Sequence, residues 1–274
     1  MESGIFLISQ GLIKKVVLGD SLGLLVDQVY GNVGTAAPAE IAIALNAYAF
    51  QIYFDFSGYT DIAMGLARLL GFRLPHNFRH PYRALDPREF WQRWHISLSS
   101  WLRDYLYISL GGNRRRPWRT YFNLLMTMLL GGLWHGAAWN FVFWGTFHGG
   151  WLATHRFFTR GAAQPPRTPE WLRRFATFHL VVAAWVLFRA PSLGAVASII
   201  RGLGVSRPMS GPFPVGTTLL VLAGLLAHQL SGRIDPESLW LRSPRFAQGA
   251  IVGVVILLVG VFSAQSQRFI YFQF

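Results

Sequence analysis

The stretch Leu130-Gly131-Gly132-Leu133-Trp134-His135-Gly136-Ala137-Ala138-Trp139-Asn140 decides the class of fold. It places an ionisable imidazole among glycines and tryptophans, inside a run apolar enough to lie in a lipid bilayer. An ionisable side chain at that depth costs free energy unless it is satisfied or used, so His135 is a candidate functional residue. The alternative is a structural histidine that hydrogen-bonds between two helices. The glycines let backbones or a substrate come close to it.

The composition of the chain is that of a membrane protein. Hydrophobic residues make up 52% of its 274 residues and charged residues 14%, against about 25% charged residues in ordinary soluble domains. We predict an all-α polytopic membrane protein with about six to eight transmembrane or re-entrant helices, some shorter than a full span. The mostly apolar segments are residues 39–54, 121–134, 137–153, 175–189, 214–230 and 248–264.

The net charge of +13 does not indicate a nucleic-acid partner, because the arginines are grouped in loops between apolar runs. Nine arginines lie between Arg79 and Arg119, with only Asp86, Glu89 and Asp104 opposing them. The positive-inside rule places this stretch in the cytoplasm, where anionic lipid headgroups would attract it. The chain has no cysteine, which excludes a cysteine nucleophile and a cysteine-ligated metal. His95 and His135 have no neighbours at a metal-ligand spacing, so no metal site is expected.

Two polar interruptions stand in the first apolar segments. Lys14 and Lys15 interrupt residues 4–30, which predicts either two half-helices or one helix with a snorkelling lysine pair. Asp55 and Asp61 interrupt the apolar run that begins near Ala39. These carboxylates either line a substrate site or seal a break in the helix.

An amphipathic helix at the membrane interface is predicted after Asp86, which is placed as its N-cap with Pro87 at the first helical position. His95 belongs to the apolar stripe of this helix, and Gly111-Gly112 ends it. The apolar stripe recurs at three-and-four spacing: Trp91, Trp94, His95, Leu98, Leu102, Tyr105 and Leu106.

Several motifs, in order, resemble the membrane-bound O-acyltransferase family and, within it, the alginate O-acetyltransferase branch. They are Phe50-Gln51-Ile52-Tyr53-Phe54-Asp55-Phe56-Ser57-Gly58-Tyr59-Thr60-Asp61, Leu74-Pro75-His76-Asn77-Phe78, Glu89-Phe90-Trp91-Gln92-Arg93-Trp94-His95-Ile96-Ser97-Leu98-Ser99 and Gly131-Gly132-Leu133-Trp134-His135-Gly136-Ala137. The dense resemblance spans residues 46–150, and residues 269–274 also look similar. It implies a single membrane domain over residues 1–274, a funnel through the bilayer, and a chain that lacks the N-terminal helices of bacterial members.

The resemblance also implies roles for individual residues. His135 matches the family's catalytic histidine, and we expect it to act as general base on a sugar hydroxyl, a task that suits a neutral imidazole. His95 matches a second histidine of bacterial members, expected to orient the acyl donor or steady the oxyanion; the alternative is a histidine satisfied on a buried helix face. Substrate-binding roles are expected for Asp55, Asp61, Trp134 and Asn140.

The function that follows is transfer of an acetyl group across the bacterial inner membrane, onto an exported, alginate-like polysaccharide. No bound cofactor is expected, and the acyl donor is acetyl-CoA or another acyl thioester at the cytoplasmic face. Further expected partners are membrane lipid, the polysaccharide and a periplasmic protein similar to an acetyltransferase or esterase. Two other functions remain open: acyl transfer to another envelope polymer, as in D-alanylation of teichoic acid, and a transporter subunit.

Overall fold

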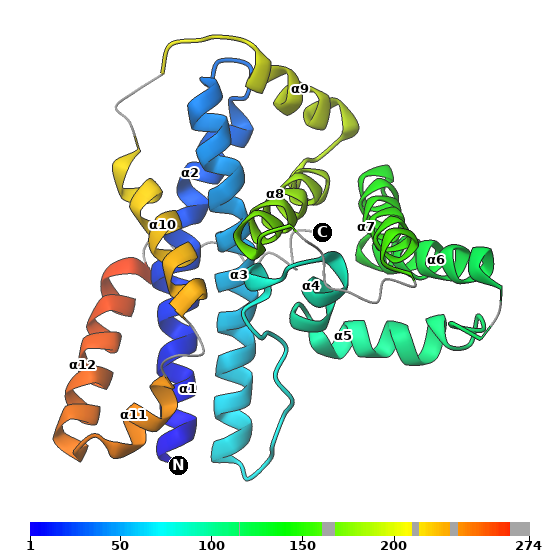
Figure 1. Ribbon diagram of the computed structural model, residues 1–274. Helices are drawn as coiled ribbons and strands as arrows, with labels where there is room; N and C mark the ends of the chain where they lie inside the picture. Colours follow the sequence, from blue (N-terminus) through cyan, green and yellow to red (C-terminus); the bar gives the residue numbers. More distant parts are fainter. Residues whose placement is uncertain (115, 161–167, 210–213, 231–234, 264–274) are drawn as a thin grey trace. The chain divides into compact units, whose positions relative to one another are not determined.

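The computed structural model describes residues 1–114, 116–160, 168–209, 214–230 and 235–263, and every regular element in these ranges is a helix (Figure 1). The all-α prediction is therefore confirmed for the described residues. The chain divides into two compact units, Met1–His76 with Gly202–Phe274, and Asn77–Arg201. The similarity noted above for residues 269–274 lies outside the described residues.

The first unit is built on two long helical segments that pack against each other. The helices α1 (Glu2–Leu12), η1 (Ile13–Gly19) and α2 (Asp20–Gly31) follow one another without a break, and α3 (Pro38–Leu69) packs against all three. Glycines permit this close packing, because a Cβ atom at Gly11 would lie 2.5 Å from the carbonyl oxygen of Gly58. The first segment is thus one helix rather than two half-helices.

The lysine pair does not snorkel toward solvent, contrary to one alternative from the sequence. Both lysines lie in η1, a π-helical stretch of seven residues. Lys14 Nζ is 2.6 Å from Asp61 Oδ2, and Lys15 Nζ is 2.7 Å from Asp20 Oδ1 and 2.6 Å from Asp55 Oδ1. A buried ammonium group paired with carboxylates avoids the cost of an isolated buried charge, which explains why the lysines turn inward.

A helix break near Asp55, one of the two alternatives from the sequence, is also wrong, because α3 continues through Asp55 and Asp61 to Leu69. Both carboxylates are buried, at 2% and 8% exposure. Their charges are compensated by the lysines of η1, so the helix does not need to open to satisfy them.

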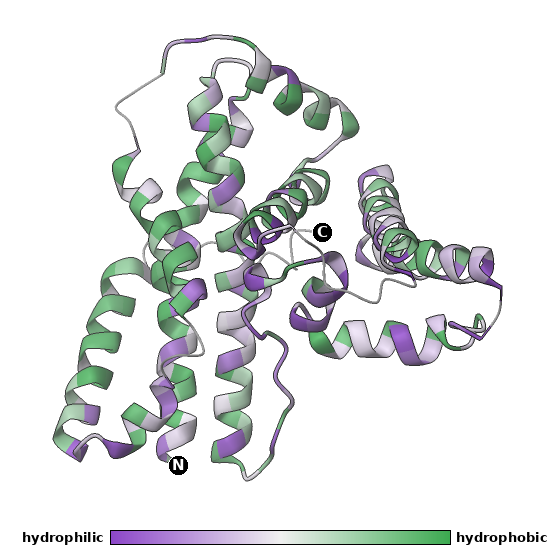
Figure 2. Cartoon of the chain, viewed as in Figure 1, coloured by the Kyte–Doolittle hydropathy of each residue, from purple (hydrophilic) through white to green (hydrophobic). Residues whose placement is uncertain are grey.

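The first unit is completed by α10 (Val215–Leu230), α11 (Pro236–Arg242) and α12 (Arg245–Phe262). α10 packs on α3, where the His228 ring lies 4.6 Å from the Tyr53 ring. Trp240 of α11 donates a hydrogen bond of 3.1 Å to the carbonyl oxygen of Glu2. Hydrophobic residues run along α12 (Figure 2), and many of them are exposed, as expected of a helix that faces lipid.

The second unit contains η2 (Pro81–Arg83), α4 (Pro87–Arg93), α5 (Ile96–Trp101), η3 (Leu102–Tyr107), α6 (Pro117–His135), α7 (Trp139–Thr159) and α8 (Glu170–Arg189). α9 (Leu193–Gly204) crosses the division between the units. α6 and α7 pack closely against each other. Glycine is needed at position 132, because a Cβ atom there would collide with the carbonyl oxygen of Phe141.

The single amphipathic helix predicted after Asp86 is wrong, although its start is right. Asp86 caps α4 by accepting a hydrogen bond of 2.8 Å from the backbone N–H of Glu89. The helix then stops at Arg93, turns at Trp94 and His95, and resumes as α5 and η3. Gly111 and Gly112 adopt positive φ angles of 104° and 52° where the segment ends. Residues 87–107 therefore form short helices with a turn at His95.

Two helices of the described residues, α8 and α12, are long and apolar enough to cross a membrane. α9 and α10 are apolar but shorter. The prediction of six to eight membrane segments around a funnel stays a prediction.

Candidate active site

His135 is the last residue of α6, at the point where the chain leaves that helix to enter α7. The turn depends on Gly136, because a Cβ atom there would lie 2.6 Å from the Phe141 ring. The first turn of α7 and the last turn of α6 are thus held close together, with the imidazole at their junction.

The imidazole of His135 is half-buried in an aromatic surround drawn from three helices. Its ring centroid lies 5.3 Å from that of Trp144 in α7 and 5.1 Å from that of Phe188 in α8, both edge-on. Trp134 lies 5.0 Å away, with 60% of its surface exposed. Aromatic side chains therefore cover part of the imidazole surface.

His95 occupies the turn between α4 and α5 with left-handed backbone angles, φ 42° and ψ 58°. A non-glycine residue in this region is uncommon and costs about 1–2 kcal/mol. Such strain persists only where the surrounding structure holds it, and it is concentrated at functional sites. The Nδ1 atom of His95 is 3.4 Å from Ser97 Oγ.

Asn77 holds this turn in place, a role that was not expected from the sequence. Its backbone carbonyl accepts a hydrogen bond of 3.0 Å from Ile96 N, and its Oδ1 accepts one of 3.1 Å from Ser97 N. Nearby, the Arg79 N–H donates to the Arg93 carbonyl at 3.0 Å. In the sequence, the one feature that pointed to Asn77 is its place in the motif Leu74–Phe78, which resembles the family.

His95 and His135 both lie in the second unit. Between them runs a series of aromatic contacts: Trp94 to Trp185 at 5.0 Å, Trp185 to Phe188 at 5.4 Å, and Phe188 to His135 at 5.1 Å. Burial lowers the pKa of His95 to about 4, so this imidazole is neutral at pH 7. Two histidines that lie more than one helix apart in sequence therefore belong to one site.

The remaining predicted residues have other surroundings. The Asn140 side chain is buried and donates to the backbone carbonyl of Ala190, which ties the start of α7 to the end of α8. Asp55 and Asp61 lie in the first unit, in the ion pairs described above, whereas the two histidines lie in the second unit. The expectation that Asp55, Asp61, Trp134 and Asn140 bind substrate stays a prediction.

His148 is fully buried in α7, surrounded by aromatic rings rather than by polar groups. Its ring lies 4.9 Å from Trp144 and 5.0 Å from Trp91. This agrees with the packing role that its position suggests. His155, to which the sequence analysis assigned no role, lines a cavity described below.

Residues 39–199 match the model of the membrane-bound O-acyltransferase family. The chain is 52% identical over 184 residues to the probable alginate O-acetylase of Azotobacter vinelandii, an alignment that covers 67% of this chain and 36% of that protein. It is 41% identical over 201 residues to the peptidoglycan O-acetyltransferase of Helicobacter pylori, covering 73% of this chain and 38% of that protein.

A lower similarity connects the chain to the teichoic acid D-alanyltransferase of Streptococcus thermophilus. The two are 31% identical over 162 residues, which covers 52% of this chain and 39% of that protein. In all three comparisons the match spans well under half the length of the relative.

Proposed function

The chain belongs to the membrane-bound O-acyltransferase family, and we propose that it carries the catalytic histidines of an enzyme that O-acetylates an exported polysaccharide. The observation that carries the proposal is that His95 and His135 lie in one unit, connected by a series of aromatic contacts, within the segment that matches the family. The names of the two relatives with the higher identities support acetyl transfer, since one is an alginate O-acetylase and the other a peptidoglycan O-acetyltransferase.

His135 acts as the general base in this proposal. The acceptor hydroxyl attacks the carbonyl carbon of the acyl thioester, so a C–O bond forms and the C–S bond breaks. The hydroxyl proton passes to the His135 imidazole, which then returns it to the departing thiolate. General-base assistance of this kind contributes roughly 10²–10⁴-fold to the rate.

His95 orients the donor carbonyl or steadies the oxyanion that develops on it. A neutral imidazole can donate one hydrogen bond, and such a donor is most effective in a site that excludes water. The strained turn supports this role, because Asn77 fixes the backbone of the two residues that follow His95.

The enzyme would act in the bacterial inner membrane as a multi-pass protein. An acyl thioester, with acetyl-CoA as one candidate, would reach the site from the cytoplasm, and the acetyl group would leave toward the periplasm. There it would pass to the polysaccharide, either directly or through a partner similar to an acetyltransferase or esterase. The arginine-rich segment 79–119 supports a cytoplasmic donor side, since thioester donors of this kind are anionic.

The test is the acyl content of the cell's exported polymers, measured by NMR in a deletion strain. Complementation with the complete gene should restore O-acetyl signals to an exopolysaccharide, and the deletion strain should lack them. Unchanged acetylation of every exported polymer in the deletion strain would contradict the proposal.

The second candidate is D-alanyl transfer to an envelope polymer, favoured by the match to the teichoic acid D-alanyltransferase. The same experiment separates the two, because D-alanyl esters give distinct proton signals. Loss of D-alanyl esters with acetyl esters retained would replace acetylation by this second function.

A further inference from the structure

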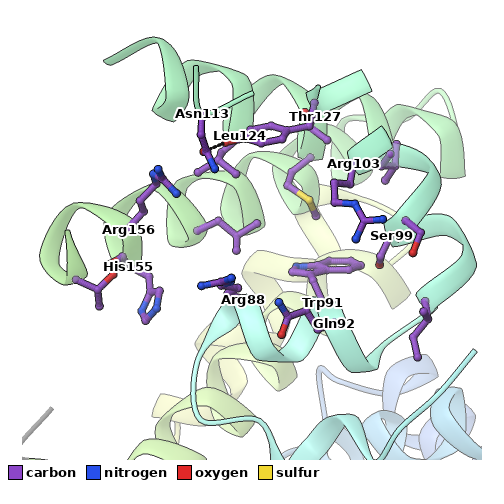
Figure 3. A pocket seen from close by; sticks show the side chains of 17 residues that line it. Arg88, Trp91, Gln92, Ser99, Arg103, Asn113, Leu124, Thr127, His155 and Arg156 are labelled. Atoms are coloured by element: carbon purple, nitrogen blue, oxygen red, sulfur yellow. Dashed lines mark hydrogen bonds between the residues drawn. The ribbon is translucent and has the colours of Figure 1, made fainter. Parts of the chain in front are cut away.

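The second unit contains a cavity of about 650 Å³ that the two histidines do not line. It lies among α4, α5, η3, α6 and α7 (Figure 3), and all its lining residues fall between Arg88 and Thr159. The cavity is large enough for part of a cofactor-sized or lipid-sized molecule.

The charged side chains that line the cavity are all arginines. Arg88 of α4 and Arg156 of α7 point into it, with His155 close by, and Arg103 of η3 lies on the other side (Figure 3). None of its described lining residues is an aspartate or glutamate. Arg103 forms an ion pair of 2.7 Å with Asp104, whereas neither Arg88 nor Arg156 pairs with a carboxylate among the residues described.

The rest of the lining combines apolar side chains with the uncharged polar side chains of Gln92, Ser99, Ser100, Tyr107, Asn113, Thr127 and Thr159. Leu124 and Met128 come from α6, Leu152 from α7 and Leu102 from η3, with Trp91 forming an aromatic wall. The cavity therefore offers two kinds of surface to one ligand: guanidinium groups that suit phosphate oxygens, and a wall of aliphatic and uncharged polar side chains that suits a hydrocarbon chain or the amide-containing pantetheine chain.

We propose that this cavity binds a phosphate group attached to a flexible, uncharged chain, with Arg88 and Arg156 holding the phosphate and the leucine wall and its neighbouring polar side chains holding the chain. Two sources supply this chemistry in a bacterial membrane. One is the phosphopantetheine portion of a thioester donor such as acyl-CoA, and the other is an anionic phospholipid.

The position of the cavity connects it with the candidate active site. Trp91 of the wall lies 5.8 Å from Trp144, and Trp144 lies 5.3 Å from His135. A donor seated here would be two ring contacts from the general base. The identification of the ligand as an acyl donor rests on the proposed acyl transfer. The prediction that the cavity binds a phosphate group does not depend on it.

The experiment measures binding of coenzyme A, and separately retention of phosphatidylglycerol, by the purified full chain in nanodiscs. The test variant is Arg88→Gln with Arg156→Gln. The matched control is Arg114→Gln with Arg116→Gln, which removes the same charge from two exposed arginines of the same unit that do not line the cavity.

We expect the test variant to bind the occupying ligand at least about ten-fold more weakly than the wild type and the control. The reason is that the loss of one charge-assisted hydrogen bond lowers the affinity by about ten-fold or more. Loss of coenzyme A binding identifies the donor source, and loss of phosphatidylglycerol retention identifies the lipid source. Either result supports the site even if no acyl transfer is detected. Equal binding by test and control variants, or no binding of either ligand by the wild type, would overturn the proposal.

A second variant tests the apolar part of the cavity and keeps every arginine. Leu152→Trp fills space beside the leucine wall and should weaken binding of the same ligand several-fold. Unchanged binding in this variant would mean that the arginines act outside the cavity, which would also overturn the proposal. Circular dichroism of each variant checks that the helices are retained.

Discussion

His95 combines a strained backbone with a partly buried imidazole, and the two properties can be separated by substitution. Glycine removes the imidazole and adopts φ 42° without strain, whereas alanine removes the imidazole and keeps the strain. We expect His95→Gly to be more stable than His95→Ala by about 1 kcal/mol in thermal unfolding, because left-handed angles cost a β-carbon that much.

Both His95 variants should lose acyl transfer to a similar extent if the imidazole takes part in the chemistry. Retained activity in His95→Gly alone would mean that only the shape of the turn matters. In that case His95 would be a structural residue.

Asn77 is a positioning residue in this account, because it touches the turn rather than the reacting atoms. Asn77→Ala removes the acceptor for Ser97 N–H and should lower stability by about 1 kcal/mol. It should lower kcat more than it raises KM, since the turn that carries His95 would shift. Asn77→Asp keeps an acceptor at the same place and should restore most of the rate; equal loss in both variants would contradict the assignment.

The residues of the site divide into those visible in the sequence and those that required the fold. His135 and His95 could be identified because they stand in motifs of several residues each. Asn77 could not be assigned, because its hydrogen bonds reach residues 96 and 97, and no periodicity links positions that far apart. Arg88, His155 and Arg156 meet at the cavity only through the packing of α4 on α7.

At the scale of elements, local chemistry was predicted correctly and tertiary contacts were not. The Asp86 cap and the glycines after Tyr107 are local features, and both are found. The turn at Trp94 and His95 was missed because the apolar spacing continues across it, although the backbone does not. The inward orientation of the lysines of η1 could not be predicted, because their partners lie in α3, across a helix–helix interface.

The α6–α7 pair supplies a prediction at this scale. Gly132→Ala places a Cβ atom against the carbonyl oxygen of Phe141, a backbone atom that cannot move alone. We expect a loss of about 1–3 kcal/mol in the free energy of unfolding, together with reduced activity, because the same contact positions His135.

Gly150→Ala is the matched control in the same helix pair, since nothing lies within 4 Å of a Cβ atom there. It should leave the stability unchanged or raise it by up to about 1 kcal/mol through helix propensity. If Gly132→Ala were as stable as Gly150→Ala in thermal unfolding, the close approach of α6 and α7 would not be required.

For the whole molecule, two helical units divide the predicted residues between them. The ion-paired aspartates and lysines stabilise the first unit, while both histidines and the cationic cavity lie in the second. The family match over residues 39–199 covers parts of both units. The proposed chemistry depends on residues of the second unit, so the first substitutions should be made there.

The role of His135 as general base of acyl transfer can be tested by the O-acetyl content of exopolysaccharide. A deletion strain would express the complete gene with His135→Ala or His135→Gln, at protein levels matched to the wild type. We expect acetylation to fall at least about 100-fold in both variants, because neither side chain can accept the hydroxyl proton. Wild-type acetyl content in either variant would contradict this role.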